Sequence, residues 1–130
     1  MVGDRISNLI NDLKTASIAG KESVIVPNSK MSVNILNLLK KENYVADYSI
    51  KGNDKVKEIV VNLKYEDGEP AIHDAKRLSK QSSRTYRSAS NIRSVRRGYG
   101  LLVVTTPKGV ISGETARKQN VGGEVLFEIW

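Results

Sequence analysis

The segment Glu-Asp-Gly-Glu-Pro at residues 66–70 interrupts the apolar pattern of this chain near its middle. Gly and Pro are the strongest local breakers of helices and strands, so no regular element is expected to run through this segment. With 130 residues, the chain is long enough for one domain or for two small lobes that share a core. We therefore predict two lobes, formed by residues 1–65 and residues 66–130.

The first lobe is predicted to contain two helices and three strands. Apolar residues recur at helical spacing in residues 4–18 and again in residues 28–44. The segment Ser-Val-Ile-Val-Pro at 23–27 is typical of a short strand, and the alternation over 44–65 is typical of a hairpin. The predicted order is helix–strand–helix–strand–strand.

Polar residues stand where helix ends are expected. Asn28 or Ser29 can cap the second helix of the first lobe, and Asn43 can end it in the left-handed conformation. Ser112 and Asn120 can do the same for a short helix in the second lobe.

The second lobe is predicted to be rich in strands, with short helices. Ile92 and Val95 are expected to face its core from one of these helices. The expected elements are strands within 71–79 and 84–87, a helix over 88–97, strands over 101–106 and 108–112, a helix over 112–120 and a strand over 122–130. The predicted fold class is α+β, with two small α/β lobes and short mixed sheets.

Positive charge is concentrated in one segment of the second lobe. The chain carries a net charge of +7, and residues 75–113 contain no Asp or Glu but nine Lys or Arg. Such a segment repels itself unless a polyanion lies against it, and Arg is well suited to bind phosphate. The pattern favours a nucleic-acid-binding protein over the alternative, a basic face exposed to solvent.

Enzyme chemistry has little support in the sequence. The chain has no Cys and a single His, His73, so a His/Cys metal cluster is excluded and no cofactor is expected. The carboxylates are scattered, without the pair that acid–base catalysis needs, and no GxxxxGK[ST] loop is present. No apolar run could span a membrane, and the first ten residues lack the features of a signal peptide. We expect a cytoplasmic protein that is not an enzyme, with an organelle matrix as the alternative location.

One predicted turn carries more hydrogen-bonding groups than a turn requires. It joins two apolar runs and holds four candidate RNA-contacting residues: Thr105, Thr106, Lys108 and Gly109. Their hydroxyls, ammonium group and accessible backbone suit a phosphate and a 2′-hydroxyl of RNA. The alternative is structural, since threonine favours strands and Pro-Lys-Gly favours a turn.

Several motifs in a fixed order identify the chain as a member of a known family. The segment TTPKGVIS resembles the Ser-Thr-Ser-Lys-Gly signature and following strand of bacterial-type ribosomal protein eight of the small subunit. ETARK and GGEVLFEIW resemble that family's Ala-Arg helix, its Gly-Gly-Glu and its closing strand. VPNSK with the helix after it, and RLSKQSSRTY with its Arg-x-Tyr ending, resemble two further segments. The likeness covers nearly the whole chain.

The resemblance implies a structural component of the small ribosomal subunit. Members of this family are primary binders of the central domain of small-subunit ribosomal RNA, where they nucleate assembly of the platform region beside neighbouring small-subunit proteins. In some bacteria they also repress translation of their own messenger RNA. The second lobe is implied to make most RNA contacts. Carried over by position, the contact residues are Thr105, Thr106, Lys108, Gly109, Tyr86, Glu124 and Arg84 in the second lobe, and Asn28, Ser29, Lys30 and Lys14 in the first.

Some positions need a separate interpretation. A carboxylate beside phosphates is unfavourable, so Glu124 is expected either to accept a hydrogen bond from a base or 2′-hydroxyl or to brace the loop. Pro107 stands where the family usually has its second serine, and Asp12 stands where its first helix often has arginine.

Two other functions are compatible with a basic chain of this size. The first is an RNA-binding translational repressor that acts off the ribosome. The second is a DNA architectural protein, which would need a helix or wedge suited to a duplex groove, and the sequence offers neither.

Overall fold

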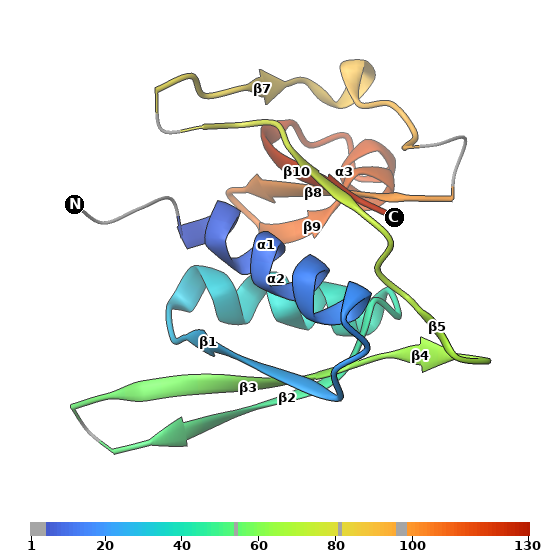
Figure 1. Cartoon of the computed structure of the whole chain (residues 1–130). Coiled ribbons are helices and arrows are strands. Elements are labelled where there is room, and N and C mark those ends of the chain that lie inside the picture. Colours follow the sequence, from blue (N-terminus) through green and yellow to red (C-terminus); the bar gives the residue numbers. More distant parts are fainter. Residues whose placement is uncertain (1–4, 54, 81, 96–98) are drawn as a thin grey trace. The chain divides into compact units, whose positions relative to one another are not determined.

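Figure 1 shows the computed structural model of the chain, which describes residues 5–53, 55–80, 82–95 and 99–130. The chain divides into two compact units, Met1–His73 and Asp74–Trp130. Each unit combines helix with antiparallel sheet, so the predicted α+β class is confirmed.

In the first unit, two helices pack against a three-stranded sheet (Figure 1). The elements of this unit are α1 (Arg5–Ile18), β1 (Ser23–Pro27), α2 (Lys30–Lys41), β2 (Val45–Gly52), β3 (Lys57–Leu63), β4 (Tyr65–Glu66) and β5 (Glu69–Pro70). The sheet has the order β1-β3-β2, and Ile59 and Val61 of its central strand are fully buried. Leu9 and Leu13 of α1 are buried as well, as the spacing of apolar residues predicted.

The Glu-Asp-Gly-Glu-Pro segment forms a tight hairpin of β4 and β5 within the first unit. The two residues between these strands both have positive φ angles, 52° for Asp67 and 81° for Gly68. Such a turn matches the right-handed twist of paired strands. The break in the apolar pattern therefore marks a turn, and the second unit begins only after His73 rather than at residue 66.

The second unit is built around β10, which pairs with β6, β7 and β8. The elements of this unit are β6 (Ala75–Arg77), β7 (Tyr86–Arg87), the 3-10 helix η1 (Ala89–Asn91), β8 (Leu101–Thr106), β9 (Gly109–Ser112), α3 (Gly113–Lys118) and β10 (Gly123–Ile129). The sheet order is β6-β10-β8-β9, and β7 pairs with the first residues of β10. Every described pairing is antiparallel. The sheets were expected to mix parallel and antiparallel pairs, and in this respect the prediction is wrong. Short connections favour this outcome, since parallel neighbours need a long crossover.

The predicted helix ends are confirmed. A backbone N–H in the first turn of α2 donates to the Ser29 hydroxyl at 3.1 Å, so Ser29 rather than Asn28 is the N-cap. Asn43 follows α2 with a φ of 67°. Ser112 caps α3 in the same way, and Asn120 follows α3 with a φ of 56°.

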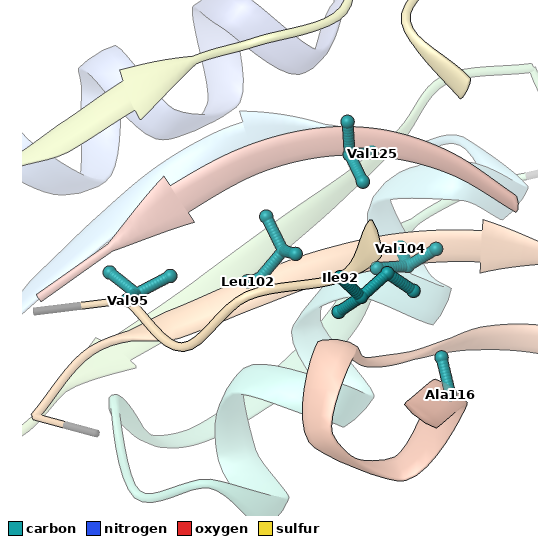
Figure 2. Packing of buried hydrophobic residues seen from close by; sticks show 6 residues of the cluster. All are labelled: Ile92, Val95, Leu102, Val104, Ala116 and Val125. Atoms are coloured by element: carbon teal, nitrogen blue, oxygen red, sulfur yellow. The ribbon is translucent and has the colours of Figure 1, made fainter. Parts of the chain in front are cut away.

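A buried apolar cluster joins α3 and the segment around η1 to the sheet of the second unit. Figure 2 shows its six buried side chains: Ile92, Val95, Leu102, Val104, Ala116 and Val125. The predicted helix over 88–97 is wrong in length, because only Ala89–Asn91 forms a 3-10 turn and the chain is extended at Ile92. Serine and asparagine, which are frequent here, prefer turns to helix interiors. The predicted burial of Ile92 and Val95 is confirmed, and Arg96 and Arg97 lie outside the described residues.

Candidate nucleic-acid interface

Tyr86, Glu124 and Thr105 lie side by side across β7, β10 and β8. In the strand register, Glu124 is opposite Tyr86 on one side and opposite Thr105 on the other. Directly opposed residues point to the same face of a sheet, and strands are about 4.8 Å apart, so this row spans roughly 10 Å. Neighbouring residues alternate between faces, which places the row on the face opposite Val104 and Val125 of the apolar cluster (Figure 2).

Two glycines allow the strands to meet at this end of the sheet. A Cβ atom on Gly123 would lie 2.3 Å from the carbonyl oxygen of Thr105. A Cβ atom on Gly122 would lie 2.7 Å from the carbonyl oxygen of Arg87. Any larger residue would therefore push β10 away from β8 or β7, and the row would open.

The Thr106 hydroxyl is used within the turn between β8 and β9. It donates to the carbonyl oxygen of Gly109 at 2.9 Å and accepts from the backbone N–H of Lys108 at 3.1 Å. Gly109 has a φ of 116°, a conformation that side-chain-bearing residues rarely adopt. Pro107 has no N–H and fixes its own φ, so it fits the turn without losing a hydrogen bond. The turn is thereby rigid, with the side chain of Lys108 exposed at its tip.

Three side-chain groups around this turn are available to a ligand. Within the described ranges, neither the Thr105 hydroxyl nor the Tyr86 phenol makes a hydrogen bond, and Lys108 makes no ion pair. Tyr86 is 69% exposed, which is unusual for an aromatic residue. Together these residues offer a hydroxyl, an aromatic face and a cation, the groups that contact sugar, base and phosphate.

Glu124 is buried and satisfied by protein groups. Its Oε2 atom accepts hydrogen bonds from the Ser79 hydroxyl and from Nη1 of Arg84, the latter at 3.1 Å. The Ser79 hydroxyl also accepts from the N–H of Thr85 at 3.1 Å. Glu124 thus links Ser79 and Arg84 to β10.

The four first-unit candidates lie on two helices. Asn28, Ser29 and Lys30 lie together at the start of α2, whereas Lys14 lies on α1. The Ser29 hydroxyl donates to Oγ of Ser32 at 2.9 Å and accepts from its N–H, so it stabilises the helix. The side chain of Lys30 is exposed.

Sequence analysis missed Ser79 and overestimated the free charge of the basic segment. Ser79 is fully buried, but its partner Glu124 is 45 positions away, so no local pattern could link them. Arg77 donates from Nη1 to the carbonyl oxygen of Leu126 at 3.1 Å, and Arg84 pairs with Glu124. These two arginines therefore stabilise the fold in addition to contributing positive charge.

Two observations bear on other classes of protein. Over the residues with described positions, no three His, Cys, Asp or Glu side chains are grouped so that they could hold a metal ion. No helix in the described part of the chain has the length and apolar character needed to cross a membrane.

Comparison with known proteins decides the family. The model of the family Ribosomal protein S8 matches residues 4–130. The chain belongs to this family. The chain also aligns with curated relatives named small ribosomal subunit protein uS8 along almost their whole length. The relative from Mycoplasmopsis pulmonis is 41% identical over 130 residues, covering 100% of this chain and 98% of the relative. The relative from Nitrobacter hamburgensis is 41% identical over 128 residues, covering 98% and 97%.

A third relative, from Mycoplasmopsis agalactiae, is 42% identical over 129 residues and covers 99% of this chain. The resemblance read from the sequence motifs is therefore confirmed. Ribosomal protein S8 is a family of structural, non-enzymatic ribosomal proteins, so the expectation that this chain is not an enzyme is confirmed as well.

Proposed function

We propose that this chain is a structural component of the small ribosomal subunit that binds the central domain of small-subunit ribosomal RNA. In this role it is a primary binder, which attaches to the RNA without other proteins and nucleates assembly of the platform region. Membership of the ribosomal protein S8 family supports the ribosomal role. The observation that carries RNA binding is the row of Tyr86, Glu124 and Thr105 beside the Lys108 turn.

Each available group has a proposed part in the contact. The Thr105 hydroxyl bonds a 2′-hydroxyl or phosphate oxygen in the shallow minor groove of an irregular RNA helix, which a narrow turn can enter. The Tyr86 ring stacks on a base that is not paired, and Lys108 neutralises a phosphate. Thr106 and Gly109 shape the turn that presents them.

The first unit is proposed to contribute secondary contacts. Lys30, Asn28 and Lys14 would meet the RNA backbone, while Ser29 keeps its helix-capping role. Residues 66–130 are proposed to supply most of the affinity, because the acid-free segment lies there. Neighbouring small-subunit proteins would cover other surfaces of the chain.

The same surface could bind a mimic of this site in the chain's own messenger RNA. The alternative function, a translational repressor that acts off the ribosome, would use this surface as well, and no observation favours it over the ribosomal role. Sedimentation at moderate salt separates the two, since a ribosomal component travels with small subunits and a free repressor does not.

RNA titration with the full chain tests the proposal directly. We expect tight binding to an RNA fragment of the central domain without other proteins, and weak binding to a fragment of equal length from another domain. Affinity should fall steeply with salt, with a log–log slope of about −0.7 to −0.9 for each phosphate contacted. Equal affinity for both fragments, or a nearly salt-independent affinity, would contradict it.

A further inference from the structure

Residues 79–80 and 82–85 belong to an excursion on the side of β10 that pairs with β6 and β7. At its start, the N–H of Ser79 donates to the carbonyl oxygen of Leu126 at 3.3 Å. At its end, the N–H of Val125 donates to the carbonyl oxygen of Thr85 at 3.0 Å. The excursion thus leaves and rejoins the same strand between β6 and β7, and it carries basic side chains into the surroundings of the candidate interface.

The Ser79 hydroxyl adds a side-chain link between the two ends of this excursion, beside the backbone hydrogen bonds that pair Lys80 with Ser83. The side chain of Ser79 is 0% exposed, donates to Glu124 and accepts from the N–H of Thr85 at 3.1 Å. A buried hydroxyl whose donor and acceptor capacities are both used is held in one orientation. The Ser79–Glu124 pair therefore helps to hold the chain in place at residues 84 and 85.

Arg84 contacts this pair directly, and Tyr86 lies beside it in the sheet. Nη1 of Arg84 lies 3.1 Å from the Glu124 carboxylate, while half of the Arg84 side chain remains exposed. Tyr86 is directly opposite Glu124 in the strand register. The pair thus holds the Arg84 side chain and is the immediate neighbour of Tyr86 in the sheet.

We propose that Ser79 is a positioning residue for the RNA interface and that Glu124 acts through it rather than by contacting RNA. This inference rests on the proposed function. Ser79 cannot reach a ligand itself, because it is fully buried. Without its hydroxyl, Glu124 and the N–H of Thr85 lose a hydrogen-bond partner, the carboxylate that holds Arg84 is less fixed, and RNA binding would have to order these groups at a cost in affinity.

Ser79→Ala is the decisive variant, and Ser112→Ala is its matched control. Ser112 is also buried in the second unit, and its hydroxyl likewise accepts from a backbone N–H, that of Thr115, at 3.1 Å. We expect Ser79→Ala to bind central-domain RNA about ten-fold more weakly than the unmodified chain. Ser112→Ala should change RNA affinity less than about two-fold, even where both variants lower the melting temperature.

A readout without RNA tests the structural step by itself. The Thr85 amide should exchange its hydrogen faster in Ser79→Ala than in the unmodified chain, and at an unchanged rate in Ser112→Ala. Faster exchange with unchanged RNA affinity would overturn the positioning role. Should Ser79→Ala fail to fold, Ser79→Cys replaces the hydroxyl with a somewhat larger thiol that hydrogen-bonds weakly, so the same comparison applies.

Combining substitutions distinguishes positioning from direct contact by Glu124. If both residues act through one contact, the double variant Ser79→Ala/Glu124→Ala has the same RNA affinity as the single variant that binds RNA less tightly. Losses that multiply would show that the two residues do not act through a shared contact and would overturn the proposal. If the unmodified chain itself has no preference for central-domain RNA, the proposed function fails, and the positioning role fails with it.

Discussion

The Thr106 hydroxyl donates its proton to the carbonyl oxygen of Gly109, 2.9 Å away across the turn between β8 and β9. The same oxygen accepts from the N–H of Lys108, so this threonine closes the turn from inside. Its neighbour Thr105 faces the opposite side of the sheet, in the row with Tyr86 and Glu124. Two adjacent threonines therefore have different tasks: one shapes the turn and the other is available for RNA.

Thr106→Val should weaken binding to central-domain RNA by about two- to ten-fold, because valine has the shape of threonine but removes the two hydrogen bonds that hold the turn. Thr106→Ser should restore binding, since the hydroxyl is retained. RNA titration of both variants at one salt concentration measures the effect. Unchanged affinity in Thr106→Val would mean that the hydrogen bonds of this hydroxyl within the turn do not affect RNA binding.

Lys108→Ala should weaken all RNA targets to a similar degree. Its ammonium group is an exposed point charge at the turn tip and carries no base specificity. The log–log salt slope should become less steep by about one phosphate's share, roughly 0.7–0.9. Titrations of a central-domain and an unrelated RNA at several salt concentrations give both quantities. Loss of affinity for the central-domain RNA alone would assign Lys108 a specific contact instead.

Pro107→Ser should bind a consensus family RNA site several-fold more tightly and melt at a slightly lower temperature. Serine offers a hydroxyl and an N–H, and a hydrogen bond to RNA is worth about 0.5–1.5 kcal/mol. Proline restricts the unfolded chain, which stabilises the fold by about 0.4–1 kcal/mol. RNA titration and thermal melting of one preparation test both. Weaker binding by the serine variant would mean that the turn does not align with the family signature at this residue.

Lys40→Ala should raise the pKa of Asp47. The hydrogen bond from Lys40, at 3.0 Å, is the main cause that holds the pKa of this carboxyl below its usual range, followed by the N–H of Tyr48 at 2.8 Å. The N–H contact remains in the variant, so the pKa should stay somewhat below the usual value. Side-chain NMR titration of Asp47 checks the direction.

The same contact gives a pH dependence with a defined sign. Because the folded-state pKa of Asp47 is lowered, its ionisation stabilises the fold above the unfolded pKa of about 3.9, and this contribution is lost as the pH falls through the folded value. The stability difference between the unmodified chain and Lys40→Ala should therefore be present at neutral pH and vanish in acid. A difference that grew in acid would contradict this assignment.

The sequence alone determined the local elements, the helix ends and the family. The spacing of apolar residues that indicates a helix or a strand depends only on residues close together in the sequence. Helix caps such as Ser29 and Asn43 likewise act within one turn, so both features can be predicted without tertiary information. The motif order likewise needs no coordinates. The helix predicted over 88–97 was too long, because a serine-rich segment can bury Ile92 and Val95 without forming a helix.

Only the tertiary structure decided how the candidate interface is built. Strand pairing brings Tyr86, Glu124 and Thr105 into one row although they are far apart in the chain, and register is a long-range property. Burial then decided that Glu124 is held by Ser79, 45 positions away, because a buried carboxylate must find hydrogen-bond donors wherever the fold supplies them.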